Sequence, residues 1–410
     1  MTCNNISRSY FTLEHCLLNG FRFVFTRQVR PMTLLTIGAR PVCTRRFLAL
    51  SLSISCVPLA AVQVYRRMST SKAGTTPSQI VQRVSPTYDA AQASGAVHFF
   101  PSTIETHNEI GVEFEIRLCP ALLKKPELPP PAFDAGNAPP SEHKSTHKDP
   151  FAPPYESALV IGELSNEDLE AEHVFLLNKF SVVQQHFLMV SKEYESQTSP
   201  LTPGDLVHAY QIMNASRSEG KSIFAFYNCG DRSGASQPHK HLQFIPIPQG
   251  GPPIERFARA QRVEDISRPF TLPGLPYAHF AYRFPTSFPS YSSAEQADAL
   301  INAYLALLDL VVSTARHQPD ERQAGGVGAP SYNVLLTLEH LHIIPRFQEK
   351  HQLEQTGEHL PVNSLGFAGA LLVKSGEELD AVKVEGVAKI LTGVGMLPVD
   401  IPSSTVHEAS

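Results

Sequence analysis

The main part of this 410-residue chain has very little cysteine. Four of the six cysteines lie within the first 60 residues, so residues 73–410 hold only Cys119 and Cys229. Two cysteines cannot build a disulfide framework, and the sequence has no Cys-x-x-Cys pair of the kind that holds structural zinc. This composition indicates a reduced, intracellular protein and argues against a disulfide-stabilised scaffold.

Basic charge is also scarce in this part of the chain. Residues 1–72 carry ten basic side chains and one acid, Glu14, which leaves 24 basic and 38 acidic side chains for residues 73–410. Non-specific binding to nucleic acid depends on lysine and arginine side chains that displace counterions from phosphates. We therefore expect no nucleic-acid partner, and any phosphate chemistry must depend on a few well-placed groups.

The N-terminal extension, residues 1–72, is rich in arginine and poor in acids, as is typical of an organelle transit peptide. Its apolar run at 47–65 is just long enough to span a bilayer, although serines and Pro58 weaken that hypothesis, and a membrane association is not expected. Met68 could equally serve as an alternative start. We expect a cytoplasmic protein, also present in the nucleus, or a mitochondrial one if the extension is part of it.

Proline punctuates the rest of the chain in two stretches. Residues 126–154 predict a surface loop, because proline is excluded from helix interiors and central strands. Residues 246–276 predict a connection between two domains, which divides the chain into 73–275 and 276–405.

Short apolar runs and capping signals predict a mixture of strands and helices. The strand predictions are Val174–Phe180 with Phe187–Lys192, Ile223–Tyr227 with His241–Ile247, and Tyr332–Leu338 with Leu341–Pro345. Helices are predicted after the capping residues Thr202 and Ser292 and over Glu377–Leu391. The elements do not alternate in a βαβ rhythm, and there is no Gly-x-Gly-x-x-Gly or Walker loop. The pattern favours an α+β fold with mostly antiparallel sheet.

The most informative segment runs from Tyr227 to Pro248, where an apolar strand, a loop of small residues and a His-Lys-His-Leu-Gln run follow one another. Alternate residues of a strand share a face, so His239, His241 and Gln243 should point together. Two imidazoles and an amide beside free backbone N–H groups suit an oxyanion such as phosphate. A neutral imidazole, with an ordinary pKa of about 6.5, can attack phosphorus near neutral pH.

The spacing alone leaves two other interpretations open. His-x-His is often half of a metal site, and His340 with His342 could supply the other half of a four-histidine zinc site. Histidine pairs on strands are also often only hydrogen-bonded parts of the structure.

The whole motif from Asn228 to Gln243 resembles the histidine-triad superfamily, and in particular the fungal diadenosine tetraphosphate phosphorylases, also called ATP adenylyltransferases. Blocks at 177–201, 275–280, 331–337 and 363–374 are similar to that family in the same order. The resemblance implies a histidine-triad-like α+β fold. It also implies an N-terminal phosphorylase domain at 73–275 and a C-terminal ATP adenylyltransferase domain at 276–405.

The resemblance also implies an activity. Family members cleave diadenosine tetraphosphate with inorganic phosphate to give ATP and ADP, and exchange nucleotides through a covalent AMP–histidine. The nucleophile corresponds to His241, with His239 and Gln243 as its catalytic neighbours. Gln243 can donate a hydrogen bond but cannot transfer a proton, which is consistent with passing AMP to phosphate rather than to water. The implied partners are a nucleotide and phosphate, with no tightly bound cofactor or metal and magnesium only with the substrate.

Further residues match substrate-binding positions of the family, although each could also be an ordinary loop, turn or capping residue. These residues are Lys125, Asn178, Lys179, Asn228, Ser233, Gly234, Ala235, Ser236, Gln237, Lys240, Asn363, Ser364, Leu365, Ala370 and Lys374. Asp231, Pro238 and Ala370 depart from the family pattern and leave the fine contacts open. His340, His342 and Arg346 could line the site or face a sheet. The alternatives are a hexose-1-phosphate uridylyltransferase and a non-catalytic nucleotide sensor.

Overall fold

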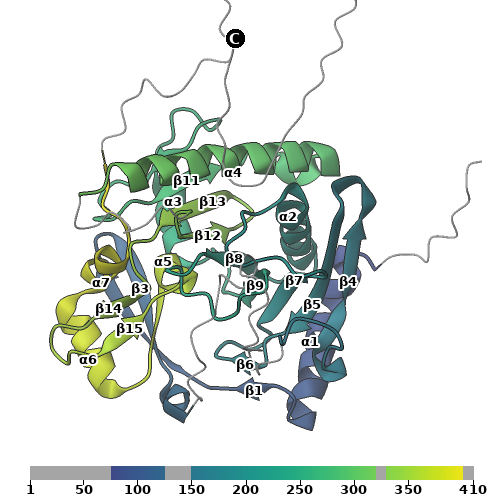
Figure 1. Cartoon of the computed structure of the whole chain (residues 1–410), viewed down its shortest axis with the longest axis horizontal. Helices are drawn as coiled ribbons and strands as arrows, with labels where there is room; N and C mark the ends of the chain where they lie inside the picture. Colours follow the sequence, from purple (N-terminus) through teal and green to yellow (C-terminus); the bar gives the residue numbers. More distant parts are fainter. Residues whose placement is uncertain (1–74, 125–148, 320–328, 400–410) are drawn as a thin grey trace, which may run out of the picture. The chain divides into compact units, whose positions relative to one another are not determined.

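The computed structural model describes residues 75–124, 149–319 and 329–399 (Figure 1). The N-terminal extension with its apolar run and Met68, most of the first proline-rich stretch, and Lys125 lie outside the described residues. The predictions made for them therefore stay predictions.

A mostly antiparallel sheet of nine strands forms the centre of the fold. Its strand order is β10-β11-β13-β12-β8-β9-β7-β5-β4. In chain order these strands are β4 (Val160–Asn166), β5 (Ala171–Leu177), β7 (Phe187–Ser191), β8 (Ile223–Cys229), β9 (His241–Pro246), β10 (Phe270–Thr271), β11 (Phe280–Arg283), β12 (Tyr332–Leu336) and β13 (His340–Pro345). The predicted pairs β5–β7, β8–β9 and β12–β13 are all confirmed as antiparallel neighbours.

Smaller sheets flank this one. A three-stranded sheet has the order β16-β3-β2. In it β16 is parallel to β3, and β2 is antiparallel to β3. Two further sheets each have two strands, β1–β6 and β14–β15. In chain order the strands of these three smaller sheets are β1 (His98–Phe99), β2 (Thr103–Glu109), β3 (Val112–Leu118), β6 (Phe180–Ser181), β14 (Lys350–Gln352), β15 (His359–Pro361) and β16 (Ala370–Val373).

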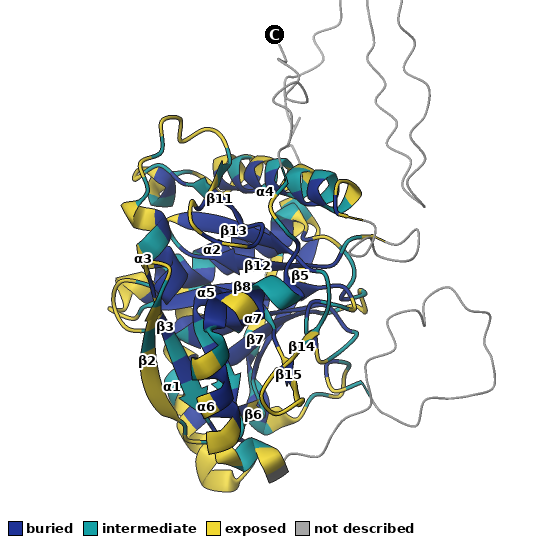
Figure 2. Cartoon of the chain, turned by 90° about the vertical axis from the view of Figure 1, so that its left-hand side faces the viewer, coloured by how far each residue is buried: buried dark blue, intermediate teal, exposed yellow. Residues whose placement is uncertain are grey.

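One face of the main sheet packs against helices α1 (Pro77–Ser94), α2 (Pro203–Ser218) and α4 (Ser293–Arg316). Capping boxes at Thr202 and Ser292 begin α2 and α4, as predicted, because each side chain accepts from the N3 backbone N–H. By length and composition α4 could cross a membrane, but its apolar side is buried in the core next to β13, which is typical of a core helix. Figure 2 shows the strands of the main sheet buried and strand β2 exposed.

The opposite face packs against α3 (Pro253–Ala260), α5 (Ser364–Ala368), α6 (Gly376–Glu385) and α7 (Val387–Val394), together with β3 and β16. The prediction of one helix over Glu377–Leu391 was wrong. Gly386 has a φ of 90°, which ends α6 and redirects the chain into α7. Residues 246–276, expected to be a connection, contain α3 and β10 and contribute buried side chains to this core.

Strands from both sides of residue 275 share the sheets. Central strand β8 pairs with β12, and β3 pairs with β16. The division at 275 stays a prediction, but parts divided there would be joined by backbone hydrogen bonds. The fold places the start of β9, and with it His241, in the middle of the sheet on the face covered by α3 and α5.

Candidate active site

His241 is the first residue of β9 and lies beside Val190 of β7. Its side chain is only 2% exposed. The next residue, Leu242, and Phe244 pack into the core on the α2 side of the sheet. The predicted alternation is therefore confirmed, with His241 and Gln243 on the other face.

The hydrogen bonds of His241 determine which of its ring nitrogens is reactive. Nδ1 lies 2.8 Å from the carbonyl oxygen of His239. A carbonyl can only accept, so Nδ1 carries the proton and Nε2 keeps its lone pair. Burial lowers the pKa of His241 to about 4, so the ring is neutral near pH 7. The side chain of Gln197 accepts from the backbone N–H of His241 at 2.8 Å and fixes the strand start.

His186, immediately before β7, is a neighbour of His241 and was not among the residues predicted for the site. It is buried and hydrogen-bonded to Gln243, and Asn178 Nδ2 lies 3.0 Å from its Nδ1. Because the amide donates to Nδ1, the proton of the neutral ring is on Nε2. Burial lowers the pKa of His186 to about 3. The structure thus brings Asn178, Gln243 and His241 together, as predicted, around a histidine that no local spacing pattern marked.

Asn228 lies near the end of β8, two residues beyond Phe226, which pairs with Gln243 of β9. The Gln197 amide donates to the carbonyls of both residues, at 2.8 and 3.3 Å. Asn228 Oδ1 accepts from Asn333 and from Ser364, whereas its Nδ2 is buried without a partner among the described residues. A buried, unpaired donor costs about 1–3 kcal/mol, and a phosphate oxygen at His241 would satisfy it.

The small-residue loop between β8 and β9 packs against the start of α5. Gly234 has a φ of 79°, and a Cβ there would lie 2.8 Å from both Asn363 Cβ and the Val362 carbonyl oxygen. Only glycine therefore permits this approach, which places Ser233 and Gly234 beside Asn363 and Ser364. In the rest of the loop the side chain of Ala235 is buried, Gln237 is half-buried and Ser236 is exposed.

An apolar slot lies along the same face, between β9 and β16. It is lined by Val183, Phe224, Ile245, Leu365 and Ala370, among others. Two of these, Leu365 and Ala370, were predicted to contact the substrate. Glu115 and Arg117 of β3 also line it.

The predicted lysines do not join His241. Lys240 is 1% exposed, and its Nζ lies 2.7 Å from Asp205 in α2 and 2.9 Å from Glu195. The prediction that Lys240 contacts substrate is corrected, because strand alternation sends this side chain away from its histidine neighbours. Lys179 pairs with Glu156 at the surface, and Lys374 is half-buried beyond the end of β16.

The described end of the first proline-rich stretch, residues 149–154, is a loop with exposed prolines as predicted, but Asp149 and Phe151 reach the site from it. Asp149 Oδ2 lies 2.8 Å from His239 Nδ1, and His239 Nε2 lies 2.9 Å from the Ser191 carbonyl oxygen. Ser191 Oγ also lies 3.2 Å from Nε2, so both ring nitrogens of His239 have hydrogen-bond partners. The Phe151 ring centroid is 4.9 Å from that of His241. Neither Asp149 nor Phe151 carried a signal in the sequence.

The second histidine pair lies elsewhere. His340 and His342 are on β13, which β12 and β8 separate from β9, so the four-histidine zinc site does not form. Glu255 lies 2.8 Å from His340 Nδ1 and 3.2 Å from His342 Nε2, a proximity that could suit a metal ion. However, Arg283 donates to His340 Nε2 at 2.9 Å, so both ring nitrogens of His340 are already hydrogen-bonded.

Arg346, which was expected to line the site or face a sheet, hydrogen-bonds to the loop between β8 and β9. It is fully buried and donates to the Ser233 carbonyl at 3.2 Å and to Asn333 Oδ1 at 2.6 Å. Burial lowers its pKa to about 9. The guanidinium thus holds the loop that adjoins Asn228.

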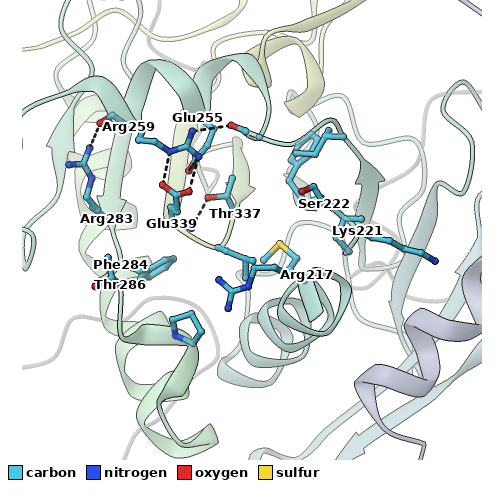
Figure 3. A pocket seen from close by; sticks show the side chains of 18 of the residues that line it. Arg217, Lys221, Ser222, Glu255, Arg259, Arg283, Phe284, Thr286, Thr337 and Glu339 are labelled. Atoms are coloured by element: carbon cyan, nitrogen blue, oxygen red, sulfur yellow. Dashed lines mark hydrogen bonds and ion pairs between the residues drawn. The ribbon is translucent and has the colours of Figure 1, made fainter. Parts of the chain in front are cut away.

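Another cavity opens at the far end of β8 and β9 (Figure 3). Arg217, Arg259 and Arg283 line it. Arg259 forms a two-pronged ion pair with Glu339, and Arg283 donates to backbone carbonyls and His340. Of the four basic residues that line it, with Lys221 as the fourth, Arg259 is paired with a carboxylate, and His241 is not among the lining residues.

Comparison with known proteins decides the family. Residues 70–257 match a model of the Ap4A phosphorylase N-terminal domain, and residues 273–397 match the ATP adenylyltransferase C-terminal domain. The chain is 30% identical to Protein APA1 of Saccharomyces cerevisiae over 335 residues, which cover 78% of this chain and 95% of that protein. The chain belongs to the Ap4A phosphorylase family.

Other relatives agree with this family. The diadenosine 5',5'''-P1,P4-tetraphosphate phosphorylase 2 of the same yeast is 32% identical over 252 residues, which cover 58% of this chain and 72% of that protein. The crystal structure of yeast Ap4A phosphorylase Apa2 in complex with AMP superposes with a TM-score of 0.63 at 26% identity, covering 78% of this chain and 98% of that one. The complex of Apa2 with Ap4A gives 0.61. The predicted resemblance and the α+β, histidine-triad-like fold are confirmed.

Proposed function

We propose that this member of the Ap4A phosphorylase family is a nucleotidyltransferase that cleaves diadenosine tetraphosphate with inorganic phosphate, giving ATP and ADP. The observation that carries the proposal is the state of His241, a buried, neutral imidazole with Nδ1 tied to a carbonyl and the lone pair left on Nε2. The names of the relatives support the substrate, since one is a diadenosine tetraphosphate phosphorylase and Apa2 was crystallised with Ap4A and with AMP.

In the first step His241 Nε2 attacks the α-phosphorus of the dinucleotide. A P–N bond forms, the bond from phosphorus to the bridging oxygen breaks, and ATP leaves with that oxygen. The resulting AMP–imidazolium keeps its proton on Nδ1, where the His239 carbonyl stabilises the charge. The Gln243 amide and the unpartnered Asn228 Nδ2 would donate to the non-bridging oxygens, whose charge changes during the transfer.

In the second step an oxygen of inorganic phosphate attacks the same phosphorus. The P–N bond breaks, ADP leaves, and His241 returns to its neutral form. Water would need a base to become an equally good nucleophile, whereas a phosphate anion does not. Gln243 cannot accept a proton, and the only lone pair of the His186 ring accepts from Asn178.

The remaining expectations form part of the proposal. The apolar slot would hold the adenine of the transferred AMP. Magnesium would reach the site bound to substrate phosphate oxygens, because it prefers oxygen ligands and keeps its waters. We propose no tightly bound cofactor and no nucleic-acid or membrane partner. We propose a cytoplasmic and nuclear location, or a mitochondrial one if residues 1–72 act as a transit peptide.

The test is to mix the enzyme with diadenosine tetraphosphate without phosphate, quench it and locate the adduct by mass spectrometry. We expect AMP on His241, released ATP in proportion, and ADP when phosphate is added. An adduct on another residue, or turnover with no adduct, would contradict the assignment. Parallel incubation with a UDP-hexose tests the uridylyltransferase alternative, and binding without any adduct would favour the sensor.

A further inference from the structure

A short segment, Asp149–Phe151, covers one side of the nucleophile, and we name it the cap. Asp149 anchors it through two contacts. One carboxylate oxygen lies 2.8 Å from His239 Nδ1, and the other accepts from the backbone N–H of Phe151 at 2.8 Å. The His239 side chain is 1% exposed and the Asp149 side chain 28% exposed, so the histidine end of this contact is buried while the carboxylate end reaches water.

Phe151 projects from the cap into an apolar cluster above β5 and β7. The members of this cluster are Phe151, Val174, Leu176, Leu188 and Val190. Its ring is 8% exposed, and its centroid lies 4.9 Å from the ring of His241 and 6.2 Å from that of His239. Val190 is also the strand neighbour of His241.

The nucleophile therefore has two unlike sides. On the β8 side stands the unpartnered amide of Asn228, and Gln243 follows along β9. On the β7 side stand the Val190 side chain and the Phe151 ring, in a cluster against which Tyr155 also packs. A phosphate anion can use the donors of the first side, whereas Val190 and the Phe151 ring offer a water molecule no hydrogen bond.

We propose that Phe151 determines the acceptor of the AMP group by keeping water away from adenylylated His241. Asp149 is a positioning residue, since it acts through His239 and the cap. The inference rests on the proposed function, because it concerns the fate of the covalent intermediate. Exclusion of water from a reactive intermediate is a general use of a closed apolar wall.

The two acceptors give different products, which makes the inference measurable. When water attacks, its oxygen bonds to phosphorus, the P–N bond breaks, one proton goes to solvent, and AMP is released. When phosphate attacks, the product is ADP. The ratio of AMP to ADP at a fixed phosphate concentration therefore reports the choice of acceptor independently of the total rate.

The experiment compares wild type with Phe151→Ala, which removes the ring, and Phe151→Leu, which keeps an apolar side chain of similar reach. For Phe151→Ala we expect the AMP:ADP ratio to rise on the order of tenfold or more, and the adenylyl-enzyme isolated without phosphate to decay faster. Phe151→Leu should stay near wild type. Asp149→Ala should shift the ratio in the same direction as Phe151→Ala.

The outcomes separate this inference from the proposed function. A wild-type enzyme that forms no ADP from diadenosine tetraphosphate and phosphate would overturn both. A wild type that forms ADP, with Phe151→Ala giving an unchanged ratio, would overturn the role of Phe151 alone. If Phe151→Ala does not fold, Phe151→Val takes its place, and an unchanged ratio in that variant has the same meaning.

Discussion

The chain carries the pattern His-x-His twice, and the histidines of the two copies have different hydrogen-bond partners. In the first, His241 starts β9 with one nitrogen tied to a backbone carbonyl and the other free to react. In the second, His340 and His342 both hydrogen-bond to the buried carboxylate of Glu255, and Arg283 occupies the remaining nitrogen of His340. The same residue types at the same spacing thus give the nucleophile that we propose in one strand and a closed network in the other.

The difference teaches that reactivity depends on what faces the ring, since the spacing is identical. A carbonyl partner fixes the proton and leaves the lone pair available, whereas a carboxylate on one nitrogen and a guanidinium on the other use both. Within the first pair the same rule separates its members, because both ring nitrogens of His239 lie within hydrogen-bond distance of Asp149 and Ser191.

The largest expected effect comes from the same substitution in each pair. His241→Asn should lower kcat on the order of 10⁵-fold or more, because the bond-forming atom is removed. His342→Asn should lower the Tm through its lost contact with Glu255 but leave kcat unchanged at temperatures where it is folded. Steady-state rates and thermal melts check both, and a comparable loss of kcat in the two variants would break the comparison.

The next effect concerns the amide beside the nucleophile. Gln243→Ala should lower kcat by about 10²–10³, the usual result of removing one donor from a charged transition state. The same change at the exposed Gln352 of β14 is the control and should have no effect on kcat. A mild loss at Gln243 would indicate that it does not contact the transferred phosphoryl group.

The second pair, His340 and His342, should contribute to the stability of the folded protein through Glu255. Burial alone would raise the pKa of Glu255, but hydrogen bonds from His340 and His342 bring it well below its ordinary value of 4.5. A lowered folded-state pKa stabilises the protein above pH 4.5, and the stabilisation is lost as the pH falls below that value. Glu255→Gln should therefore lower the free energy of unfolding by about 3–5 kcal/mol at pH 7.

Urea denaturation of wild type and Glu255→Gln at several pH values measures this contribution. The difference between them should shrink as the pH falls below 4.5. A difference that does not change with pH would show that the carboxylate charge contributes nothing.

A smaller effect concerns the pH dependence of adenylylation. Because burial lowers the pKa of His241 to about 4, the ring stays neutral far below the range in which an exposed histidine is protonated. The single-turnover rate of ATP release without phosphate should be constant from pH 8 to about 5 and fall towards pH 4. Rapid-quench measurement checks it, and a fall centred near 6.5 would indicate an open site.

The smallest expected effect is that of removing zinc. The two histidine pairs lie too far apart to share an ion, and His239 and His340 each have both ring nitrogens hydrogen-bonded. Purified enzyme should contain no stoichiometric zinc, and zinc chelation should leave kcat/KM unchanged. Elemental analysis that finds one tightly held zinc per chain, with activity lost on its removal, would favour the metal hypothesis instead.

Much of the fold could be predicted from the sequence because its signals are local. Capping boxes mark the first turns of α2 and α4, and runs of apolar residues mark the paired strands. The break at Gly386 escaped prediction, because a glycine inside an apolar helical pattern does not reveal whether its φ will be positive.

For the site, the sequence predicted the residues that one motif brings together, such as His241, Gln243 and Asn228. It could not predict partners that only the tertiary fold supplies. Asp149 lies far before His239 in the chain and across a proline-rich stretch, and His186 stands alone before its strand. Lys240 was misassigned by proximity in sequence, although strand alternation already pointed its side chain away.

The pairing of β8 with β12 has a consequence for how the protein is made. During synthesis β8 leaves the ribosome well before β12. The edge of β8 that pairs with β12 therefore stays unpaired until β12 has been made. A chain cut between β9 and β10 would yield two fragments, each ending in an unpaired central strand. Association of the two fragments would pair β8 with β12 again and complete the nine-stranded sheet that holds His241. The fold is therefore a suitable starting point for a split-enzyme reporter.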